Sequence, residues 1–376
     1  MSNVPMAHVC SSCFDDLDIR AWIRNVGGPR GCDFCNGYDS PTVELHEVCR
    51  HIEECLGKFW GLAVDQLPYE SAEGGYQGQT WDTAEVVFDE EGLSLPRDDG
   101  TLYEAILREL TDELWCDWDW LSLDKDMALR SSWETFCENV KHNRRFFFHA
   151  LGASSDDRDS YSAEGILRAI AHLSEELGLV QALPLGTRIW RARADIPLGK
   201  RVSTSDFGPP PKQYALQSNR MNPPGIPMMY AASTARTAKL ETRAKSAKVG
   251  QWRTLRAARI LDLRRLPEVP GTFSESTREE TLGVRFLRHF SNAIMSPVAR
   301  DEHVHIDYLP SQVVTEFLRD FPFEGGKLDG VAYGSTVDSR GWNLALFAEP
   351  RDLGLGVEVR HEVREPWLES QKAIRL

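Results

Sequence analysis

Apolar residues recur at intervals of three and four along four stretches in the first half of this chain. The stretches are ELHEVCRHIEECLGKFW (44–60), TLYEAILRELTDELW (101–115), SWETFCENVKHNRRFFFHAL (132–151) and AEGILRAIAHLSEELGL (163–179). This spacing places the apolar side chains on one face of a helix, and Asp or Ser near several of the starts can cap it. The pattern predicts an all-helical bundle of four or five helices over residues 39–182.

From residue 185 onward the pattern changes to short strands and short helices. Strands are predicted for RIWRARA (188–194), MMYAA (228–232), ARILDL (258–263), DGVAYGS (329–335) and WNLALFAE (342–349), and a helix for SQVVTEFLRDF (311–321). In RIWRARA, Ile189, Arg191 and Arg193 share one face because side chains alternate along a strand. The three prolines of KRVSTSDFGPPPKQ (200–213) predict a loop. Residues 183–376 are therefore predicted to form an α+β domain.

Composition and charge narrow the function classes. The chain of 376 residues is long enough for two domains that each bury a core, and its net charge of −14 is unevenly distributed. Residues 1–180 carry 14 Lys and Arg against 35 Asp and Glu, whereas residues 181–376 carry 29 against 22. The acidic first half argues against general nucleic-acid binding, which depends on neutralising phosphates. The basic second half is suited to a small anionic ligand.

The chain shows no targeting or membrane signal. No apolar segment reaches the roughly 18 residues that a membrane span needs, and the N-terminus MSNVPMAHVCSSCFDD lacks the basic and apolar regions of a signal peptide. We therefore expect a cytoplasmic protein with no membrane partner. In a reducing compartment its eight cysteines remain thiols, and closely spaced thiols there more often hold metal than form disulfides.

Four of the cysteines form two CxxC pairs near the N-terminus. Cys10 and Cys13 form the first pair, Cys32 and Cys35 form the second, and 18 residues separate the two pairs. Two such pairs can place four thiolates tetrahedrally around Zn²⁺, so residues 1–38 are predicted to be a structural zinc module. The alternative is four buried thiols without metal. A redox CxxC is disfavoured because no βαβ pattern surrounds either pair.

The stretch NRMNPPGIPMMYAASTARTAKLET (219–242) concentrates candidate chemistry in the second half. Prolines stiffen a turn after Arg220, a strand carrying Tyr230 follows, and Ser233 or Thr234 can cap the next helix. Small residues line one face of that helix, and Glu241 lies at the flank of this face, where it can point into a cleft. Taken singly, Tyr230 is also explained as a core aromatic residue, and Arg191 and Arg193 as ion-paired surface residues.

These motifs, in this order, carry a resemblance to a known family. IWRAR, the turn around Arg220, Gly225-x-Pro-x-x-Tyr230, the Ala-x-x-Glu helix, YLPSQVVTEFL and DGVAYGSTVDSRGWNLALF together are similar to the RES domain over roughly residues 185–350. The acidic first half with its CxxC pairs resembles the HEPN-related region that precedes RES in some longer members. One departure is that Asn219 and Met221 flank Arg220 where many members have glycine and tryptophan.

The resemblance implies a fold related to diphtheria-toxin-type ADP-ribosyltransferases and an activity on NAD⁺. Cleavage of the nicotinamide–ribose bond by water or phosphate is the expected reaction, and transfer of ADP-ribose to a protein is the alternative. By motif, Arg191, Glu241 and Ser335 match the catalytic positions, and Arg220 and Tyr230 match substrate-binding positions. Guanidinium groups suit the pyrophosphate, a carboxylate stabilises an oxocarbenium-like ribose, and Tyr230 can stack on nicotinamide. Ser335 can hydrogen-bond the substrate or orient Glu241.

The family likeness also implies a toxin or anti-phage effector, because NAD⁺ depletion is harmful to a cell. We therefore expect an inhibitory or triggering protein partner, for which the acidic half is a candidate surface. The sequence leaves open whether the chain forms a homo-oligomer. A non-catalytic binding module is a further alternative.

The predicted bundle contains a second pair of candidate catalytic residues. Arg144 and His149 form the Arg-x4-His motif that can supply a ribonuclease site in HEPN proteins, although such a pair also arises by chance in a helix. His303 and His305 in DEHVHIDY could act as metal ligands on one face of a strand, with an exposed edge strand as the preferred interpretation.

Overall fold

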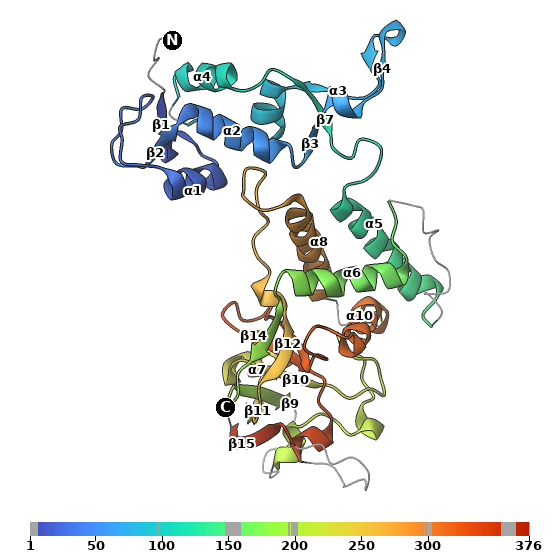
Figure 1. The fold of residues 1–376 in the computed structure, drawn as a ribbon. Coiled ribbons are helices and arrows are strands. Elements are labelled where there is room, and N and C mark those ends of the chain that lie inside the picture. The colour runs from blue at the N-terminus through green and yellow to red at the C-terminus, as the bar shows by residue number, and fades with distance from the viewer. Residues whose placement is uncertain are drawn as a thin grey trace. The chain divides into compact units, whose positions relative to one another are not determined.

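The computed structural model describes most of the chain, namely residues 7–96, 98–146, 159–194, 196, 202–296, 298, 303–354 and 366–375. It contains two compact units, of which the first comprises residues 1–125 with 268–284 and the second residues 126–267 with 285–376 (Figure 1). This division differs from the predicted boundaries after residues 38 and 182. Those boundaries remain a prediction about modules along the chain.

The first unit combines helices with three small antiparallel sheets. Its helices are α1 (Leu17–Val26), α2 (Leu45–Leu56), α3 (Ala63–Gln66), α4 (Thr101–Glu109) and the first turns of α8 (Arg278–Met295), with the single turns η1 (Ser11–Cys13), η2 (Ser71–Glu73) and η3 (Glu85–Glu90). Its strands pair as β1 (His8–Cys10) with β2 (Thr42–Glu44), β4 (Tyr69–Glu70) with β5 (Gly75–Tyr76), and β7 (Leu114–Asp117) between β3 (Trp60–Leu62) and β6 (Trp81–Asp82). The predicted all-helical character of this region is therefore wrong.

The stretch 101–115, which was predicted as one helix, shows why the all-helical prediction failed. Only Thr101–Glu109 is helical, and Leu114–Asp117 form strand β7 with an exposed, buried, buried, exposed pattern. Between them, the backbone N–H and the hydroxyl of Thr111 both donate to Glu53 Oε1, at 2.6 and 2.7 Å. A side chain from α2 thus holds the chain where the helix ends, and this contact is invisible to local periodicity.

Helix α6 (Ala163–Glu176) forms at its predicted position, whereas α5 (Lys125–Glu138) begins before the predicted stretch 132–151 and ends within it. The two helices do not complete a bundle with α2 and α4. Their buried residues, such as Trp133 and Ile170, share a core with Phe290 of α8 and Val314 of α10 (Leu309–Asp320). The predicted single bundle over residues 39–182 is therefore wrong, because its last two helices bury their apolar faces within the second unit.

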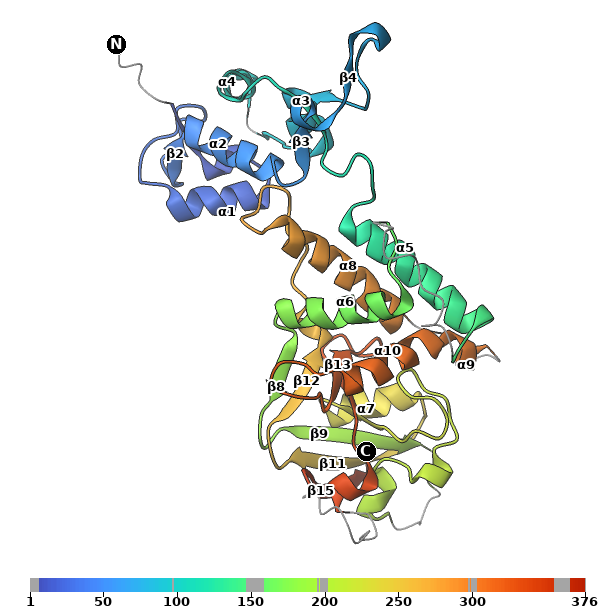
Figure 2. The same ribbon diagram turned by 45° about the vertical axis from the view of Figure 1, so that its right-hand side comes forward.

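The second unit is built on an eight-stranded sheet with the order β15-β11-β9-β10-β14-β13-β12-β8 (Figure 2). The strands are β8 (Val180–Leu183), β9 (Arg188–Ala194), β10 (Met229–Ala232), β11 (Ala247–Thr254), β12 (Ala258–Asp262), β13 (Gly330–Gly334), β14 (Trp342–Leu346) and β15 (Leu368–Arg375). Among the strands that the structure describes, only β12 and β13 pair in parallel. All five predicted strands and the helix α10 are confirmed, and the mixed content fits the predicted α+β class.

Both faces of this sheet are covered. On one face, Leu261, Val331 and Ala345 share a core with the helices α6, α8 and α10. On the other face, Met229 and Leu344 pack against residues such as Phe207 of the loop after β9. Helix α7 (Ala235–Thr242) packs separately on β9 and β11. Shorter elements are η4 (Asn139–Asn143), η6 (Thr204–Phe207), η7 (Lys212–Tyr214), η8 (Leu263–Arg265), α9 (Val304–Asp307) and η9 (Pro350–Leu353).

Within the described ranges, none of the helices has the length and apolar character that crossing a membrane would require.

Candidate active site

The sheet of the second unit opens between two of its central strands. Strands β9 and β10 pair only at Trp190 and Ala232, whereas β9 pairs with β11 along its whole length from Arg188 to Ala194. Beyond Trp190, the edge of β9 that faces β10 therefore has no strand partner. A cavity of about 580 Å³ lies here, lined by residues of β9, β10, β13, β14 and α7.

Arg191 contributes a buried cation to this cavity. Its side chain is 9% exposed, and its Nη1 has no hydrogen-bond partner among the described residues. Burial and, after it, the neighbouring charge of Arg193 together lower the pKa of Arg191 to about 9. A buried guanidinium with an unsatisfied donor is costly unless an anion completes it, so this position is suited to an anionic ligand.

Glu241 contributes the opposite charge from the last turn of α7. The helix begins at the N-cap Thr234, whose hydroxyl accepts from the backbone N–H of Thr237 at 3.0 Å. Glu241 Oε1 accepts two hydrogen bonds, one from Ser335 Oγ and one from Asn343 Nδ2, both at 2.6 Å. Both bonds fall on the same oxygen, so Oε2 is left without a hydrogen bond from any described residue. The carboxylate is thus oriented while one oxygen stays available to a ligand.

Ser335 is itself held by the turn that follows β13. Its hydroxyl accepts from the backbone N–H of Val337 at 3.3 Å and of Asp338 at 3.2 Å. Its backbone N–H donates to the carbonyl of Gly341 at 3.1 Å. Ser335 does not line the cavity. In this geometry it orients Glu241, which is one of the two roles that the sequence left open.

Tyr230 lies in the wall of the cavity on β10. Its hydroxyl donates to Asn222 Oδ1 at 2.8 Å and accepts from the backbone N–H of Met221 at 3.1 Å. Burial raises the pKa of Tyr230. The phenol is therefore fixed and neutral, and it ties the proline-rich turn to the strand while its ring faces the cavity.

Arg220 does not lie with these residues. Its Nη1 donates to the backbone carbonyls of Ile294 and Ser296 at the end of α8, the latter at 3.0 Å, and its guanidinium lies 5.6 Å from the ring centroid of Tyr308. These contacts place it at a separate pocket of about 150 Å³. The unpaired carbonyls at a helix C-terminus attract a cation, which explains this orientation. The substrate-binding role expected for Arg220 has no support from this geometry and stays a prediction.

Arg193 is the second arginine at the cavity. Its Nε donates to the carbonyl of Asp206 at 3.0 Å and its Nη2 to that of Gly208 at 3.2 Å, while burial lowers its pKa. The alternation of RIWRARA placed Arg193 on the same face as Arg191, so the sequence contained this signal. Sequence reasoning missed Asn343, whose only signal is a polar residue that interrupts the apolar strand WNLALF, and the buried Tyr333.

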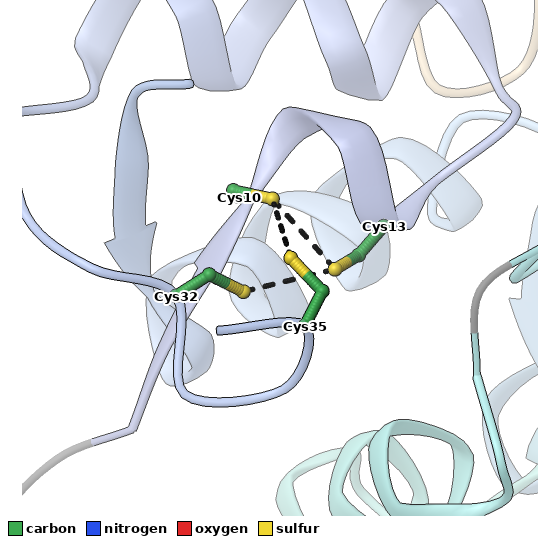
Figure 3. A group of neighbouring side chains, drawn as sticks. All are labelled: Cys10, Cys13, Cys32 and Cys35. Atoms are coloured by element: carbon green, nitrogen blue, oxygen red, sulfur yellow. Dashed lines mark hydrogen bonds between the residues drawn. The ribbon is translucent and has the colours of Figure 1, made fainter. Parts of the chain in front are cut away.

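The four predicted cysteine ligands come together in the first unit (Figure 3). The Sγ–Sγ distances are 3.7 Å for Cys10–Cys13, 3.5 Å for Cys10–Cys35 and 3.7 Å for Cys13–Cys32, and all four sulfurs lie within 4.8 Å of one another. Four thiolates about 2.3 Å from a tetrahedral metal ion would have edges of about 3.8 Å. The cysteines are not paired in disulfides. This donor set fits a metal ion.

Two further candidate pairs from the sequence are Arg144 with His149 and His303 with His305. Arg144 is exposed at the end of η4, and His149 lies outside the described residues, so the structure does not test that pair. The predicted strand around His303 and His305 is wrong, because Val304–Asp307 form the short helix α9. Within the part of the chain that the structure describes, the four cysteines form the one metal-type group, and neither histidine belongs to such a group.

Comparison with family models agrees with these observations. The model for HEPN/RES N-terminal domain 1 matches residues 25–154, and the model for the RES domain matches residues 188–367. The chain thus contains a RES domain preceded by a HEPN-related N-terminal region. The predicted resemblance is confirmed. The RES domain indicates an NAD-utilising enzyme. Searches of curated proteins and of solved structures gave no significant match.

Proposed function

We propose that this RES protein degrades NAD⁺ by cleaving its nicotinamide–ribose bond, with water or phosphate as the acceptor. One observation carries the proposal: the unpartnered Arg191 guanidinium and the oriented Glu241 carboxylate line the same cavity of a RES domain. NAD⁺ has matching parts, since its pyrophosphate is anionic and its ribose develops positive charge as the bond breaks.

The residues of the cavity divide the work between binding and bond cleavage. Arg191 and Arg193 hold the pyrophosphate, and the Tyr230 ring packs against nicotinamide. As the ribose C1–nitrogen bond breaks, its electron pair leaves with neutral nicotinamide and the ribose becomes oxocarbenium-like. Glu241, held by Ser335 and Asn343, stabilises this cation electrostatically. Water then adds to C1 and releases a proton, which gives ADP-ribose; addition of phosphate gives ADP-ribose 1″-phosphate.

The opening of the sheet between β9 and β10 supports a fold related to the ADP-ribosyltransferases. A cleft at the point where two central strands separate gives a dinucleotide access to side chains that the sheet would otherwise bury. The resemblance found in the sequence and the RES family match point to the same fold.

The cysteine cluster supports a structural Zn²⁺ site. All four tetrahedral positions are supplied by the protein, which leaves no open position for a substrate. Cys10 is the last residue of β1 and Cys13 the last residue of the turn η1 that follows, and the backbone N–H of Asn36 donates to the carbonyl of Cys32 at 3.0 Å in the second knuckle. Zinc here would fasten the β1–β2 region of the first unit, and the chemistry in the second unit does not use it.

The biological role that fits this chemistry is that of a toxin or anti-phage effector held in check by a partner. Unregulated loss of NAD⁺ is harmful to the cell that makes the enzyme. The acidic first half offers a surface for an inhibitory or triggering protein. Nicotinamide release by the purified chain that no protein from the producing cell lowers or raises would contradict this regulatory part.

The test is to incubate the purified chain with NAD⁺, with and without phosphate, and to follow nicotinamide and the ADP-ribose product by chromatography. We expect release by the wild type and by Glu279→Gln, an exposed control on α8, and loss of release in Glu241→Gln. ADP-ribose identifies hydrolysis, and its 1″-phosphate identifies phosphorolysis. Modified protein without free ADP-ribose would identify an ADP-ribosyltransferase. Equal release by Glu241→Gln and wild type would refute the assigned site.

A further inference from the structure

A second cavity of about 360 Å³ adjoins the first one. The two cavities share five lining residues, namely Arg191, Arg193, Gln217, Asn219 and Tyr230. They therefore form one cleft with two lobes, which we call the Glu241 lobe and the Tyr214 lobe. The two arginines lie on the wall that the lobes share.

The two lobes differ in chemistry. The Glu241 lobe contains the only acidic residue among the described lining residues, whereas no acidic residue lines the Tyr214 lobe. The Tyr214 lobe is instead lined by apolar and aromatic groups that include Pro210, Tyr214, Leu216 and Met228. Tyr214 is 69% exposed and Leu216 is 75% exposed, so large apolar surfaces face solvent beside the lobe. Such surfaces are suited to a flat, uncharged ring.

The wall of the Tyr214 lobe is fastened to the sheet at one end and to the proline-rich turn before β10 at the other. Phe207 is fully buried against β11, where a Cβ on Gly250 would come within 2.5 Å of its ring, so glycine is required there. The hydrogen bonds from Arg193 to the carbonyls of Asp206 and Gly208 attach the same segment to β9. At the other end, the backbone N–H of Gly225 donates to the carbonyl of Ala215 at 2.7 Å. The segment that carries Tyr214 is thus positioned before any ligand binds.

We propose that the Tyr214 lobe binds the adenine end of the dinucleotide, with Tyr214 and Leu216 packing against the base. This inference rests on the proposed function, which places the ribose that is attached to nicotinamide beside Glu241 and so assigns it to the Glu241 lobe. With the reacting ribose at Glu241 and the pyrophosphate at Arg191 and Arg193, the adenosine extends past the arginines into the other lobe. The enzyme then selects dinucleotides over mononucleotides through contacts remote from the bond that breaks.

The first test compares cleavage of NAD⁺ with that of nicotinamide mononucleotide, which has the same reacting bond but no adenosine. We expect Tyr214→Ala and Leu216→Ala to lower the ratio of kcat/KM for NAD⁺ over the mononucleotide by roughly tenfold, as losing a stacked base contact does. Tyr69→Ala, a tyrosine of similar exposure (65%) in the first unit, keeps the wild-type ratio. An unchanged ratio in both Tyr214→Ala and Leu216→Ala would overturn the proposal.

The second test needs no turnover, so it separates this inference from the proposed function. AMP, which contains adenine but no nicotinamide, is titrated by calorimetry into the wild type, Tyr214→Ala and Glu241→Gln. We expect AMP to bind the wild type and Glu241→Gln alike and to bind Tyr214→Ala about tenfold more weakly. AMP affinity that falls in Glu241→Gln but not in Tyr214→Ala would place adenine in the Glu241 lobe and refute the inference, whether or not the enzyme cleaves NAD⁺.

Discussion

Replacing Asn343 tests whether Glu241 acts as an oriented carboxylate. Asn343 lies on β14, is buried, and donates to Glu241 Oε1 at 2.6 Å. Asn343→Ala removes that donor and leaves Ser335 as the one described hydrogen-bond donor to the carboxylate. The backbone pairing of residue 343 with Ala232 and Tyr333 does not depend on the side chain, so the sheet register should persist.

The expected loss of activity in Asn343→Ala follows from the energy of the hydrogen bond to Glu241 that this variant lacks. A hydrogen bond to a charged group contributes about 1.5–3 kcal/mol. If the bond is fully used in positioning the carboxylate for the transition state, its loss lowers kcat/KM by about 10- to 150-fold. Ser335→Ala should have an effect of similar size. Because both bonds act on one oxygen, the double variant should lose less than the product of the two single effects.

Steady-state nicotinamide release over a range of pH is the assay, with thermal unfolding as a check of folding. Asn343→Asp places a second carboxylate beside Glu241, and like charges disfavour ionisation, so the acid limb of the pH–rate profile should move to higher pH. Asn292→Ala, an exposed asparagine on α8, is the matched control. Wild-type kcat/KM in Asn343→Ala, with an unmoved acid limb in Asn343→Asp, would refute the reasoning that Glu241 needs this partner.

Three further predictions concern the metal site, a close contact and the buried cation. Cys32→Ser should lose the bound zinc measured by elemental analysis and melt at a lower temperature, whereas Cys137→Ser should retain the metal. Gly341→Ala should lower the free energy of unfolding by about 1–3 kcal/mol in urea titration, because its Cβ would lie 2.3 Å from Thr237 Oγ1; wild-type stability would contradict this clash. Burial lowers the pKa of Arg191 to about 9, so this group is cationic below that pH and loses its charge above it. ADP affinity measured by calorimetry should therefore be steady up to about pH 8 and fall above pH 9, and an affinity that is flat to pH 10 would show that Arg191 does not hold the phosphates.

The candidate site shows where sequence reasoning succeeded and where it stopped. Arg191 and Glu241 were identified from ordered motifs, and the structure places both at one cavity. Arg220 was assigned to substrate binding by its motif, the turn that precedes Tyr230, yet it lies against the end of α8. The contacts that decide this come from Ile294 and Ser296, more than 70 residues away along the chain. Neighbours in sequence share a turn, but they need not share a cavity.

The sequence by itself determined the features that depend on local periodicity and short spacing. These are the five predicted strands of the second half, the helices α2, α6 and α10, and the two CxxC pairs, each of which needs only one tight turn to bring its own two sulfurs together. Tertiary structure alone decided which helices share a core, where the sheet opens between β9 and β10, and that Asn343 reaches Glu241. Such contacts join segments far apart along the chain, 102 residues in the case of Glu241 and Asn343, and they follow from burying the faces of whole elements together. Residue patterns within one segment do not encode that choice of partner.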